Sequence, residues 1–382
     1  LDEPKQNLEV SNGIIYVKDD KSRSLTYAEL TKGKKIVQRL TKKPTIKKSK
    51  DFKIIGKPTL SIDAVSKVTG KAKYSGDVLL PDLVHAFVVR PKVYGSKKLS
   101  VDGSGIEEFI GVELLEDGDL VAVVHSDPEI AKKAAKKVQV TWEEPIEKAN
   151  NETIFKYLED NINESKVSES EGSIEEGKNA SETILEANYY DGYKAHAAIE
   201  THAATCYFEG DKLIVWASTQ TPFGTRDELS KTFDIPKENV HIKQIFIGGG
   251  FGGKVYSYQA VEAAKLSKLC GKPVQLVWSR REEFMYDRFR PASLLKVVSG
   301  IDKEGNLKLW NFDIYCAGTR GTKLFYDIPN NRTRMFDKRD IHPLGTGAWR
   351  APGNNTTTFA RESHIDVTAH AIGMDALEFR LN

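Results

Sequence analysis

The sequence predicts an α+β fold, because strand-like and helix-like patterns both recur along its 382 residues. One observation is a strand-like run at 241–247 that leads through a glycine-rich loop into a helix-like stretch at about 256–270. A second is a pair of strand-like runs at 293–299 and 308–316, separated by Asp302-Lys303-Glu304-Gly305-Asn306, a composition typical of a hairpin turn. Together they favour a mixed fold over a strictly alternating one.

The first part of the chain divides by composition. Residues 1–55 are polar with few core signals, so we expect an extended lead-in, and its lysine-rich stretch Lys42–Lys53 is typical of a solvated arm. Residues 56–145 predict a compact unit. Asp127-Pro128 begins a helix in that unit, because Asp caps helices and proline fits the first turn. The strands of the unit are expected at 83–90, 120–125 and 138–142.

The second part is expected to begin with a linker and continue as a mixed α/β unit. Residues 146–182 are acidic and rich in Ser, Asn and Gly, which predicts a linker or long surface loop. Residues 183–382 predict a mixed unit that begins with a strand at 183–189, contains a helix at 222–233 and ends in a mostly helical stretch at 357–381. The candidate core positions of that last stretch are Ala360, Ile365, Val367, Ala371 and Leu377.

Composition limits the classes of partner. Hydrophobic residues make up 40% of the chain and the formal net charge is +2, so cores are expected and a nucleic-acid partner is not. No apolar run approaches the roughly 20 residues of a membrane span. The three cysteines, Cys206, Cys270 and Cys316, are too far apart to predict an iron–sulfur or zinc site. Each is expected as a packed thiol, with any redox cluster on another chain.

The most distinctive segment is Ile247-Gly248-Gly249-Gly250-Phe251-Gly252-Gly253-Lys254. Glycine adopts positive φ readily and lets the backbone approach a ligand closely. Successive N–H groups in such a turn form a cradle for anions. Because the loop follows an apolar run and precedes a helical pattern, it predicts a ligand-binding loop.

Spacing alone suggests two ligand classes for this loop. A P-loop is disfavoured because the residue after the lysine is Val255, which has no oxygen for Mg²⁺. A dinucleotide fingerprint remains open, since Gly248, Gly250 and Gly253 satisfy G-x-G-x-x-G and Ser279-Arg280-Arg281 suits the ribose phosphate of NADP. The predicted hairpin downstream weighs against it, because a dinucleotide-binding domain continues with alternating strands and helices.

The loop also resembles the signature glycine loop of the molybdenum hydroxylases, the xanthine oxidase and aldehyde oxidase family. Further segments resemble that family in the same order, over roughly residues 55–382. Ser24-Leu25-Thr26-Tyr27-Ala28-Glu29-Leu30, within 22–35, suggests the isoquinoline 1-oxidoreductase-like branch. The collinear segments are the hammerhead-like start at 65–77, Trp216-Ala217-Ser218-Thr219-Gln220-Thr221-Pro222, Arg288-Phe289-Arg290-Pro291-Ala292 and Gly347-Ala348-Trp349-Arg350-Ala351-Pro352-Gly353.

The resemblance implies a fold, a cofactor and a reaction. The fold is a small α/β-hammerhead domain over 56–145, followed by the first molybdopterin-binding α/β domain over 183–382. The cofactor is molybdenum held by molybdopterin, usually as a cytosine dinucleotide, so no side chain of the protein needs to ligate the metal. The implied reaction hydroxylates an aldehyde or N-heteroaromatic with oxygen from water, and electrons pass to a [2Fe–2S] partner subunit.

The resemblance also assigns site residues by position. Gln220 is expected to hydrogen-bond an oxo ligand of the metal, Phe251 to face a flat substrate, and Arg350 to lie beside the cofactor. These three are the expected catalytic contacts. The cofactor-binding set is Gln220, Gly249, Gly250, Phe251, Gly252, Ala348, Trp349 and Arg350, and the weaker substrate candidates are Glu200, Val255 and Arg290.

Two features depart from the family pattern. Purine-oxidising relatives often carry Glu where this chain has Val255, so an aldehyde or less polar heterocycle is the expected substrate. The family's general base is a glutamate in a Gly-Glu pair, and this sequence contains no such pair. We therefore expect the remaining part of the large subunit as a partner, and no activity from this chain alone. An NADP-binding oxidoreductase using Gly248–Gly253 and a non-catalytic module derived from a hydroxylase stay open as alternatives.

Overall fold

The computed structural model describes residues 1–39, 41, 43 and 45–382. They form two compact units, Leu1–Ala64 and Val65–Asn382. Within the predicted solvated arm, Lys42 and Pro44 lie outside the described residues. The described residues of that arm are exposed, apart from the half-buried Phe52.

The N-terminal unit contains a small antiparallel sheet and one short helix: β1 (Leu8–Ser11), β2 (Ile14–Val17), β3 (Asp20–Thr26) and α1 (Tyr27–Thr31). Asn12 and Gly13 join the first two strands with φ of 52° and 79°, the positive values that a two-residue hairpin turn requires. Thr26 and Glu29 cap the helix reciprocally. The expectation of an extended lead-in is wrong for residues 8–31, because this Asn-Gly turn pairs two short strands.

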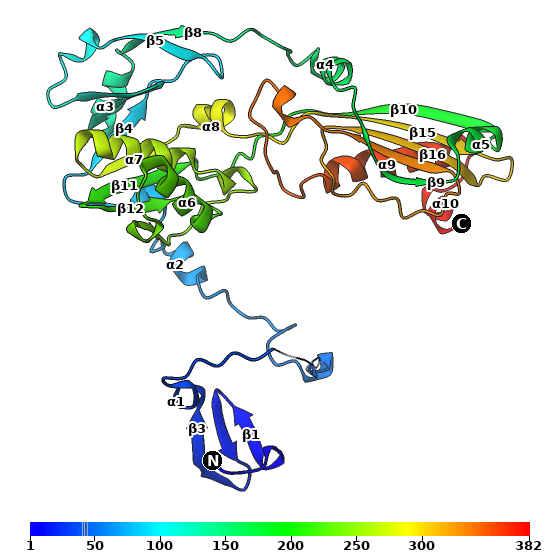
Figure 1. The fold of residues 1–382 in the computed structure, drawn as a ribbon, viewed down its shortest axis with the longest axis horizontal. Helices are drawn as coiled ribbons and strands as arrows, with labels where there is room; N and C mark the ends of the chain where they lie inside the picture. The colour runs from blue at the N-terminus through cyan, green and yellow to red at the C-terminus, as the bar shows by residue number, and fades with distance from the viewer. Residues whose placement is uncertain (40, 42, 44) are drawn as a thin grey trace. The chain divides into compact units, whose positions relative to one another are not determined.

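A mixed sheet of seven strands forms one part of the C-terminal unit (Figure 1). In sheet order its strands are β13 (Val240–Lys243), β12 (Lys212–Ala217), β11 (Ala203–Glu209), β14 (Val274–Val277), β4 (Val84–Val88), β7 (Leu120–His125) and β6 (Glu113–Asp117). The helices that pack on it are α3 (Pro128–Ala135), α6 (Pro222–Phe233) and α7 (Tyr258–Cys270). A separate pair is formed by β5 (Lys97–Asp102) and β8 (Gln139–Glu143).

This sheet joins segments that the sequence places in different domains. β14 pairs in parallel with β4, so strands from the 56–145 segment and from the 183–382 segment share one sheet. The hammerhead boundary at 145 therefore stays a prediction. α7 approaches the sheet through three fully buried alanines, Ala260, Ala263 and Ala264, whose small side chains allow close helix–sheet contact.

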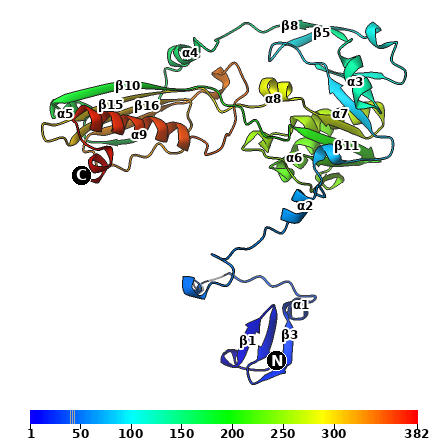
Figure 2. The same cartoon turned by 180° about the vertical axis from the view of Figure 1, so that it is seen from behind.

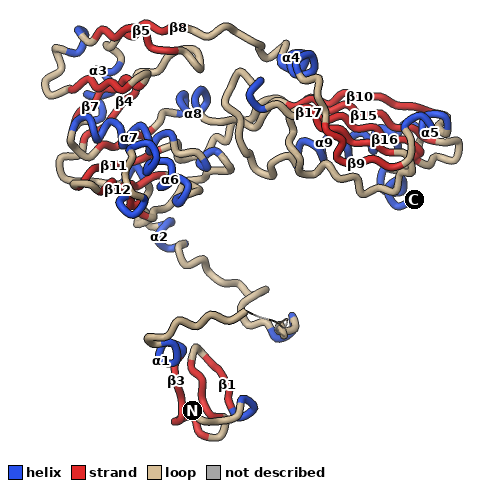
Figure 3. The backbone as a smooth tube through the Cα atoms, viewed as in Figure 1, coloured by secondary structure: helices blue, strands red, loops and turns tan. Residues whose placement is uncertain are grey.

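A second sheet of five strands forms the other part of the unit, with long strands drawn in red in Figure 3. In sheet order they are β10 (Thr183–Asp191), β15 (Ser293–Ile301), β16 (Leu307–Tyr315), β17 (Asn331–Phe336) and β9 (Lys166–Glu171). β15 and β16 pair antiparallel, which confirms the predicted hairpin. The neighbouring helices are α4 (Ile154–Asn161), α5 (Ile174–Asn179), α9 (Asn354–Ala371) and α10 (Ala376–Leu381).

Helices cover both faces of the five-stranded sheet. α9 lies along one face, where Leu295 packs in one cluster with Ala360 and Ile365 (Figure 2). The neighbouring residue Leu294 points to the other face and packs with Leu158 of α4. Adjacent strand residues serve opposite faces because side chains alternate along a strand.

The predicted linker at 146–182 is wrong, because it contains α4, β9 and α5. Leu158 of α4 is fully buried under the sheet. β9 has the sequence Lys-Val-Ser-Glu-Ser-Glu and lies at the sheet edge, where polar residues are tolerated and no hydrophobic alternation is required. The sequence pattern therefore does not show that these residues form a strand.

The predicted helical core positions at the end of the chain are partly right. Ala360 and Ile365 are buried, whereas Val367 and Leu377 are 47% and 64% exposed and Ala371 is also exposed. The buried stripe of α9 continues instead through His364, Thr368 and Ala369. Two of these are polar residues, which apolar periodicity overlooks. Among the described residues, no helix has the length and hydropathy to cross a membrane.

Replacing Asp127 by alanine should loosen α3. The carboxylate Oδ1 of Asp127 accepts hydrogen bonds from the backbone N–H groups of Glu129 (2.8 Å) and Ile130 (3.3 Å). Losing such a cap costs about 1 kcal/mol, so hydrogen exchange of the α3 amides should accelerate roughly fivefold. Glu129→Ala is the matched control, because that carboxylate accepts no hydrogen bond from a backbone N–H among the described residues. Equal exchange in the two variants would contradict the prediction.

Candidate functional site

The glycine loop is tightly shaped by its neighbours. Gly249, Phe251 and Gly252 have φ of 97°, 54° and 114°, all in the left-handed region. A Cβ on Gly250 would lie 2.5 Å from Oε1 of Gln220, and one on Gly252 would lie 2.1 Å from the carbonyl oxygen of Ala348. Side chains at these two positions would clash, so the sequence uses glycine there.

The loop leaves three consecutive amides available. Three other N–H groups of the loop are bonded within the protein: that of Gly248 donates to Glu200 (2.7 Å), that of Gly252 to Gln220 (2.9 Å) and that of Gly253 to the carbonyl of Gly250 (2.9 Å). The amides of Gly249, Gly250 and Phe251 carry no recorded hydrogen bond to any described residue. The cradle expected from the sequence thus has free donors at its tip.

Gln220 is held with its amide nitrogen available. Its backbone N–H donates to the carbonyl of Lys254 (2.7 Å), and its side-chain Oε1 accepts from the N–H of Gly252 (2.9 Å). The residue is exposed, and its Nε2 has no recorded partner in the described part of the chain. Fixing the oxygen in this way presents the NH₂ group as a donor to a ligand oxygen.

A second loop lies directly against the first. The segment from Gly345 to Gly353 is anchored by backbone bonds between Phe289 and both Gly345 and Gly347, each 2.9 Å. The carbonyl of Ala348 lies where a Cβ on Gly252 would be. The structure therefore brings together the two loops that the sequence assigned to one cofactor. Arg350 is exposed and its guanidinium has no recorded partner in the described part of the chain.

His196 holds the second loop, and the sequence favoured a structural role over a catalytic one for this histidine. Its Nδ1 lies 2.8 Å from Asp287 and its Nε2 lies 2.8 Å from the carbonyl of Ala348. Two acceptors facing both ring nitrogens favour the protonated ring. Burial lowers the pKa of His196, but the bonds to Asp287 and Ala348 and the charges of Asp287 and Glu283 raise it, and the net pKa lies above its ordinary value.

The stability of this unit should therefore depend on pH through His196. Because the folded pKa is raised, the stabilisation is fully present below the unfolded pKa of about 6.5 and is lost as pH rises through the folded pKa. His196→Gln keeps a donor for the Ala348 carbonyl but removes the titration. Denaturant midpoints from about pH 6 to 9 should show the wild-type advantage over His196→Gln shrinking with pH; a constant difference would contradict it.

Glu200 and Lys254 form a buried ion pair beneath the loop. Lys254 is 1% exposed, and its Nζ donates to Oε2 of Glu200 (2.8 Å) and to the carbonyl of Glu200 (2.9 Å). Burial lowers the pKa of Lys254, and Glu200 opposes that shift. The carboxylate of Glu200 thus holds the base of the glycine loop, and a substrate contact by Glu200 stays a prediction.

The remaining substrate candidates have different surroundings. Val255 is 37% exposed, and its carbonyl accepts a hydrogen bond from Thr221 (2.8 Å). Arg290 is 7% exposed, pairs with Asp191 and lies 4.9 Å from the ring centroid of Trp349. Arg290 therefore combines an ion pair with a cation–π contact.

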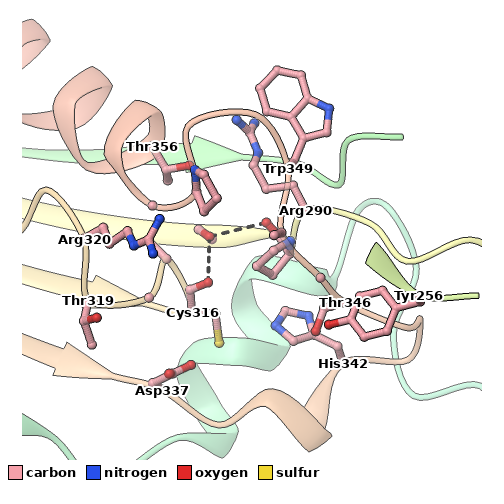
Figure 4. A pocket seen from close by; sticks show the side chains of 18 residues that line it. Tyr256, Arg290, Cys316, Thr319, Arg320, Asp337, His342, Thr346, Trp349 and Thr356 are labelled. Carbon is pink, nitrogen blue, oxygen red and sulfur yellow. Dashed lines mark hydrogen bonds between the residues drawn. The ribbon is translucent and has the colours of Figure 1, made fainter. Parts of the chain in front are cut away.

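Two cavities border the loops. The first, called the Arg290–Arg320 cavity, has a volume of about 340 Å³ (Figure 4) and is lined among others by Arg290, Cys316, Arg320, Trp349, Pro352 and Thr356. The second, of about 690 Å³, is lined by Gln220, Phe223, Arg226 and Lys243 among others. Ala348 and Trp349 line the first and Gln220 the second, whereas Phe251 and Arg350 line neither. The expected contacts thus do not enclose one pocket.

Backbone strain concentrates around the same loops. In the described residues, four residues other than Gly, Asp and Asn have left-handed φ: Ala197 (50°), Phe251 (54°), Cys316 (60°) and Ala351 (56°). Each costs roughly 1 kcal/mol or more in this region. Ala197 adjoins His196, and the other three lie in the glycine loop, the cavity wall and the second loop. Sequence patterns carry no signal for such strain at non-glycine residues.

The cysteines behave as packed thiols. Cys206 and Cys316 are buried, which confirms the sequence expectation for these two, and Cys270 is half-buried. Burial raises the pKa of Cys206, and it raises the pKa of Cys316 to about 11. Both are therefore thiols at neutral pH.

The dinucleotide interpretation conflicts with the topology. A βαβ unit places its two parallel strands beside each other or near each other in one parallel sheet. Here β12 and β11 separate β13 from β14, and β14 pairs antiparallel with β11. The strand β13 also ends at Lys243, before the glycines begin.

Comparisons with known proteins agree with the sequence resemblance. Residues 154–382 match the family described as the molybdopterin cofactor-binding domain. A nicotinate dehydrogenase subunit from Pseudomonas putida is 25% identical over 99% of this chain and 34% of that protein. The large molybdopterin subunit of nicotinate dehydrogenase from Eubacterium barkeri is 26% identical over 87% of this chain and 89% of that subunit.

Solved structures show the same fold. Quinoline 2-oxidoreductase from Pseudomonas putida 86 superposes with a TM-score of 0.71 and 20% identity, over 84% of this chain and 49% of that chain. Aldehyde oxidoreductase from Desulfovibrio gigas gives 0.70 and 22%, over 84% of this chain and 42% of that one. The α+β fold class is thereby confirmed. The chain spans about half the length of these structures, and a third of the Pseudomonas putida nicotinate dehydrogenase subunit.

Proposed function

Because this chain belongs to the molybdopterin cofactor-binding domain family, we propose that it forms the cofactor-binding part of a molybdenum hydroxylase. One observation carries the proposal. The amides of Gly249, Gly250 and Phe251 have no hydrogen-bond partner among the described residues. The next residue of this loop, Gly252, binds the side chain of Gln220 and lies against Ala348. Two loops and a glutamine distant in sequence thus converge on one point.

The residues present fit a pterin-held metal. Such a group needs hydrogen-bond donors for its oxygens rather than ligating side chains. Donors are available in the three free amides, in Nε2 of Gln220 and in the unpartnered guanidinium of Arg350, all within the described part of the chain. These residues would hold the cofactor, which supplies two-electron redox chemistry when bound.

The residues of this chain hold the ligand-binding groups in position and do not themselves transfer a proton. Gly252 directs the donor of Gln220, and the ring of Phe251 is 48% exposed and lies beside Gly249 of the same loop. An exposed ring next to the donors would stack on a flat substrate, which contributes about 0.5–1.5 kcal/mol. The Lys254–Glu200 pair keeps the loop base fixed.

The proposal also assigns the general base and the electron acceptor to other polypeptide segments. The sequence contains no Gly-Glu pair for the general base, so that base belongs to the remaining part of the large subunit, and a [2Fe–2S] subunit receives the electrons. The proposed substrate is an aldehyde or an N-heteroaromatic compound. The proposed form of the cofactor is the cytosine dinucleotide. The hammerhead domain is proposed to end at residue 145.

Released nucleotide and metal content test this proposal. The chain is isolated from a host that makes the molybdenum cofactor, acid-treated, and the nucleotide identified by mass, with molybdenum measured by elemental analysis. CMP and molybdenum are expected together. Release of NADP would contradict the proposal, and absence of both nucleotide and metal would favour a non-catalytic module. Dye-linked oxidation by the chain alone should be absent.

A further inference from the structure

The strand β10 leaves one long edge of the five-stranded sheet open. It is the first strand in the sheet order, and β15 is its one neighbour among the described strands (Figure 1). Its nine residues, Thr183–Asp191, pair with β15 without a register shift. In the described part of the chain, their backbone groups have no recorded hydrogen bond to any other element. Because alternate residues of a strand point their backbone groups to opposite sides, a row of donors and acceptors faces outward.

This edge lacks most of the features that prevent strands from pairing between molecules. Exposed edge strands are commonly short, or they carry lysine, proline or a bulge. The sequence Thr-Ile-Leu-Glu-Ala-Asn-Tyr-Tyr-Asp contains neither lysine nor proline. The opposite edge strand, β9, is six residues long, carries Lys166 and shifts in register against β17. Its Glu169 also accepts a hydrogen bond from the backbone N–H of Leu324 (2.8 Å). One edge of the sheet is therefore protected and the other is not.

Two large apolar side chains are exposed on β10. Ile184 is 43% exposed and Tyr190 is 54% exposed, near opposite ends of the strand. Phe359 of α9 is 48% exposed and lies edge-on to Tyr189, with the ring centroids 5.8 Å apart. The exposed apolar surface thus continues from the strand to the helix that packs beside it. Burial of such surface is the main driving force for association between proteins.

The sequence of β10 is complementary to itself in one antiparallel register. A twofold axis through Ala187 pairs all nine residues of one copy with those of a second copy. Ile184 then faces Tyr190 of the other copy, and such pairs of a β-branched and an aromatic residue stabilise neighbouring strands. Glu186 faces Asn188 of the other copy, so no like charges are directly opposed.

The neighbouring registers pair fewer residues and are less favourable. Opposite residues must point their backbone groups at each other, so the twofold axis has to pass through a residue. An axis through Glu186 places two carboxylates directly opposite each other, which is destabilising. An axis through Asn188 places Ile184 opposite Gly192, beyond the end of the strand. The register about Ala187 is therefore the favoured one.

We propose that two copies of this chain associate through β10, which pairs antiparallel about Ala187 and makes one continuous sheet across the dimer. Such a contact uses the same surface on both copies and closes on itself. A second copy is the occupant because the strand is complementary to its own sequence. The inference does not rest on the proposed function, since it uses neither the glycine loop nor Gln220.

Sedimentation equilibrium of the purified full chain tests the inference. Between about 1 and 100 μM, the mass should rise from 42.7 kDa toward twice that value. Ile184→Lys places a lysine opposite Tyr190 on both sides of the axis and should raise the dissociation constant of the dimer at least about tenfold. Val167→Lys is the matched control, because Val167 is a 51% exposed apolar residue on the other edge strand, and it should leave that constant unchanged.

A second variant should strengthen the dimer. Asn188→Lys places a lysine opposite Glu186 of the other copy at two symmetric positions, and it should lower the dissociation constant at least about threefold at low salt. A register centred on Asn188 would instead oppose two lysines and weaken the dimer. Circular dichroism and thermal melting of each variant show that the fold is retained.

Several outcomes would overturn the inference. A monomer at every concentration would assign this edge to a different polypeptide. A dimer that Ile184→Lys leaves intact, or that Val167→Lys weakens equally, would place the contact elsewhere. Weaker association of Asn188→Lys would exclude the register about Ala187. None of these measurements depends on bound CMP or molybdenum, so a failure of this inference is distinguishable from a failure of the proposed function.

Discussion

Replacing Gly252 by alanine should destabilise the C-terminal unit by about 3 kcal/mol or more and abolish cofactor retention. The new Cβ would lie 2.1 Å from the carbonyl oxygen of Ala348 and 2.8 Å from its carbon, both backbone atoms that cannot move independently. The left-handed φ of 114° adds a conformational cost. The two loops must separate, which also breaks the bond from Gly252 N–H to Gln220. Chemical denaturation and molybdenum content measure the two effects.

A matched glycine isolates the steric part of this effect. Gly271 ends α7 with a left-handed φ of 67°, and a Cβ there would meet nothing within 4 Å. Gly271→Ala should therefore cost only about 1 kcal/mol and leave molybdenum content unchanged. Equal destabilisation by the two substitutions would show that the loop contact is not tight.

Replacing Lys254 by methionine should cost about 3–5 kcal/mol, because it leaves the carboxylate of Glu200 in a mostly buried place without its cation. The side chains of Lys254 and Glu200 are 1% and 15% exposed, so water screens their interaction weakly. Oε1 of Glu200 is already buried without a partner among the described residues, and Oε2 would keep only the N–H of Gly248. Denaturant unfolding gives the change in free energy.

The double variant Lys254→Met with Glu200→Gln is the control for this prediction. The neutral amide can still accept from Gly248 and carries no charge that needs a partner. It should recover a large part of the loss, giving a coupling of at least about 1 kcal/mol in the double-mutant cycle. Additive losses would mean that the two groups do not interact in solution.

The sequence predicts strongly patterned elements well. The helix at 222–233 and the strand at 120–125 have the predicted bounds, because Pro222 marks the first turn and the strand is an uninterrupted apolar run. The edge strand β9 could not be predicted, since edge residues face solvent and need no hydrophobic alternation. Val367 was expected in the core, but the buried stripe of α9 runs through polar residues such as His364.

In the candidate site, too, residues in a local sequence motif could be predicted and residues joined only by tertiary contacts could not. The glycines of the loop are visible in the sequence as a cluster, and a Cβ at Gly248, Gly250, Gly252 or Gly253 would lie within 3 Å of a neighbouring atom. The contacts of His196 could not be predicted, because its partners Asp287 and Ala348 lie 91 and 152 positions away. Contacts of this kind arise from tertiary packing, which local patterns do not encode.

Anomalous diffraction at the molybdenum edge tests the central claim most directly. In crystals of the chain purified from a host that makes the cofactor, a single molybdenum peak is predicted beside Gln220 and the Gly249–Phe251 amides. A peak remote from these donors, or adenine dinucleotide density on the glycine loop, would contradict the account.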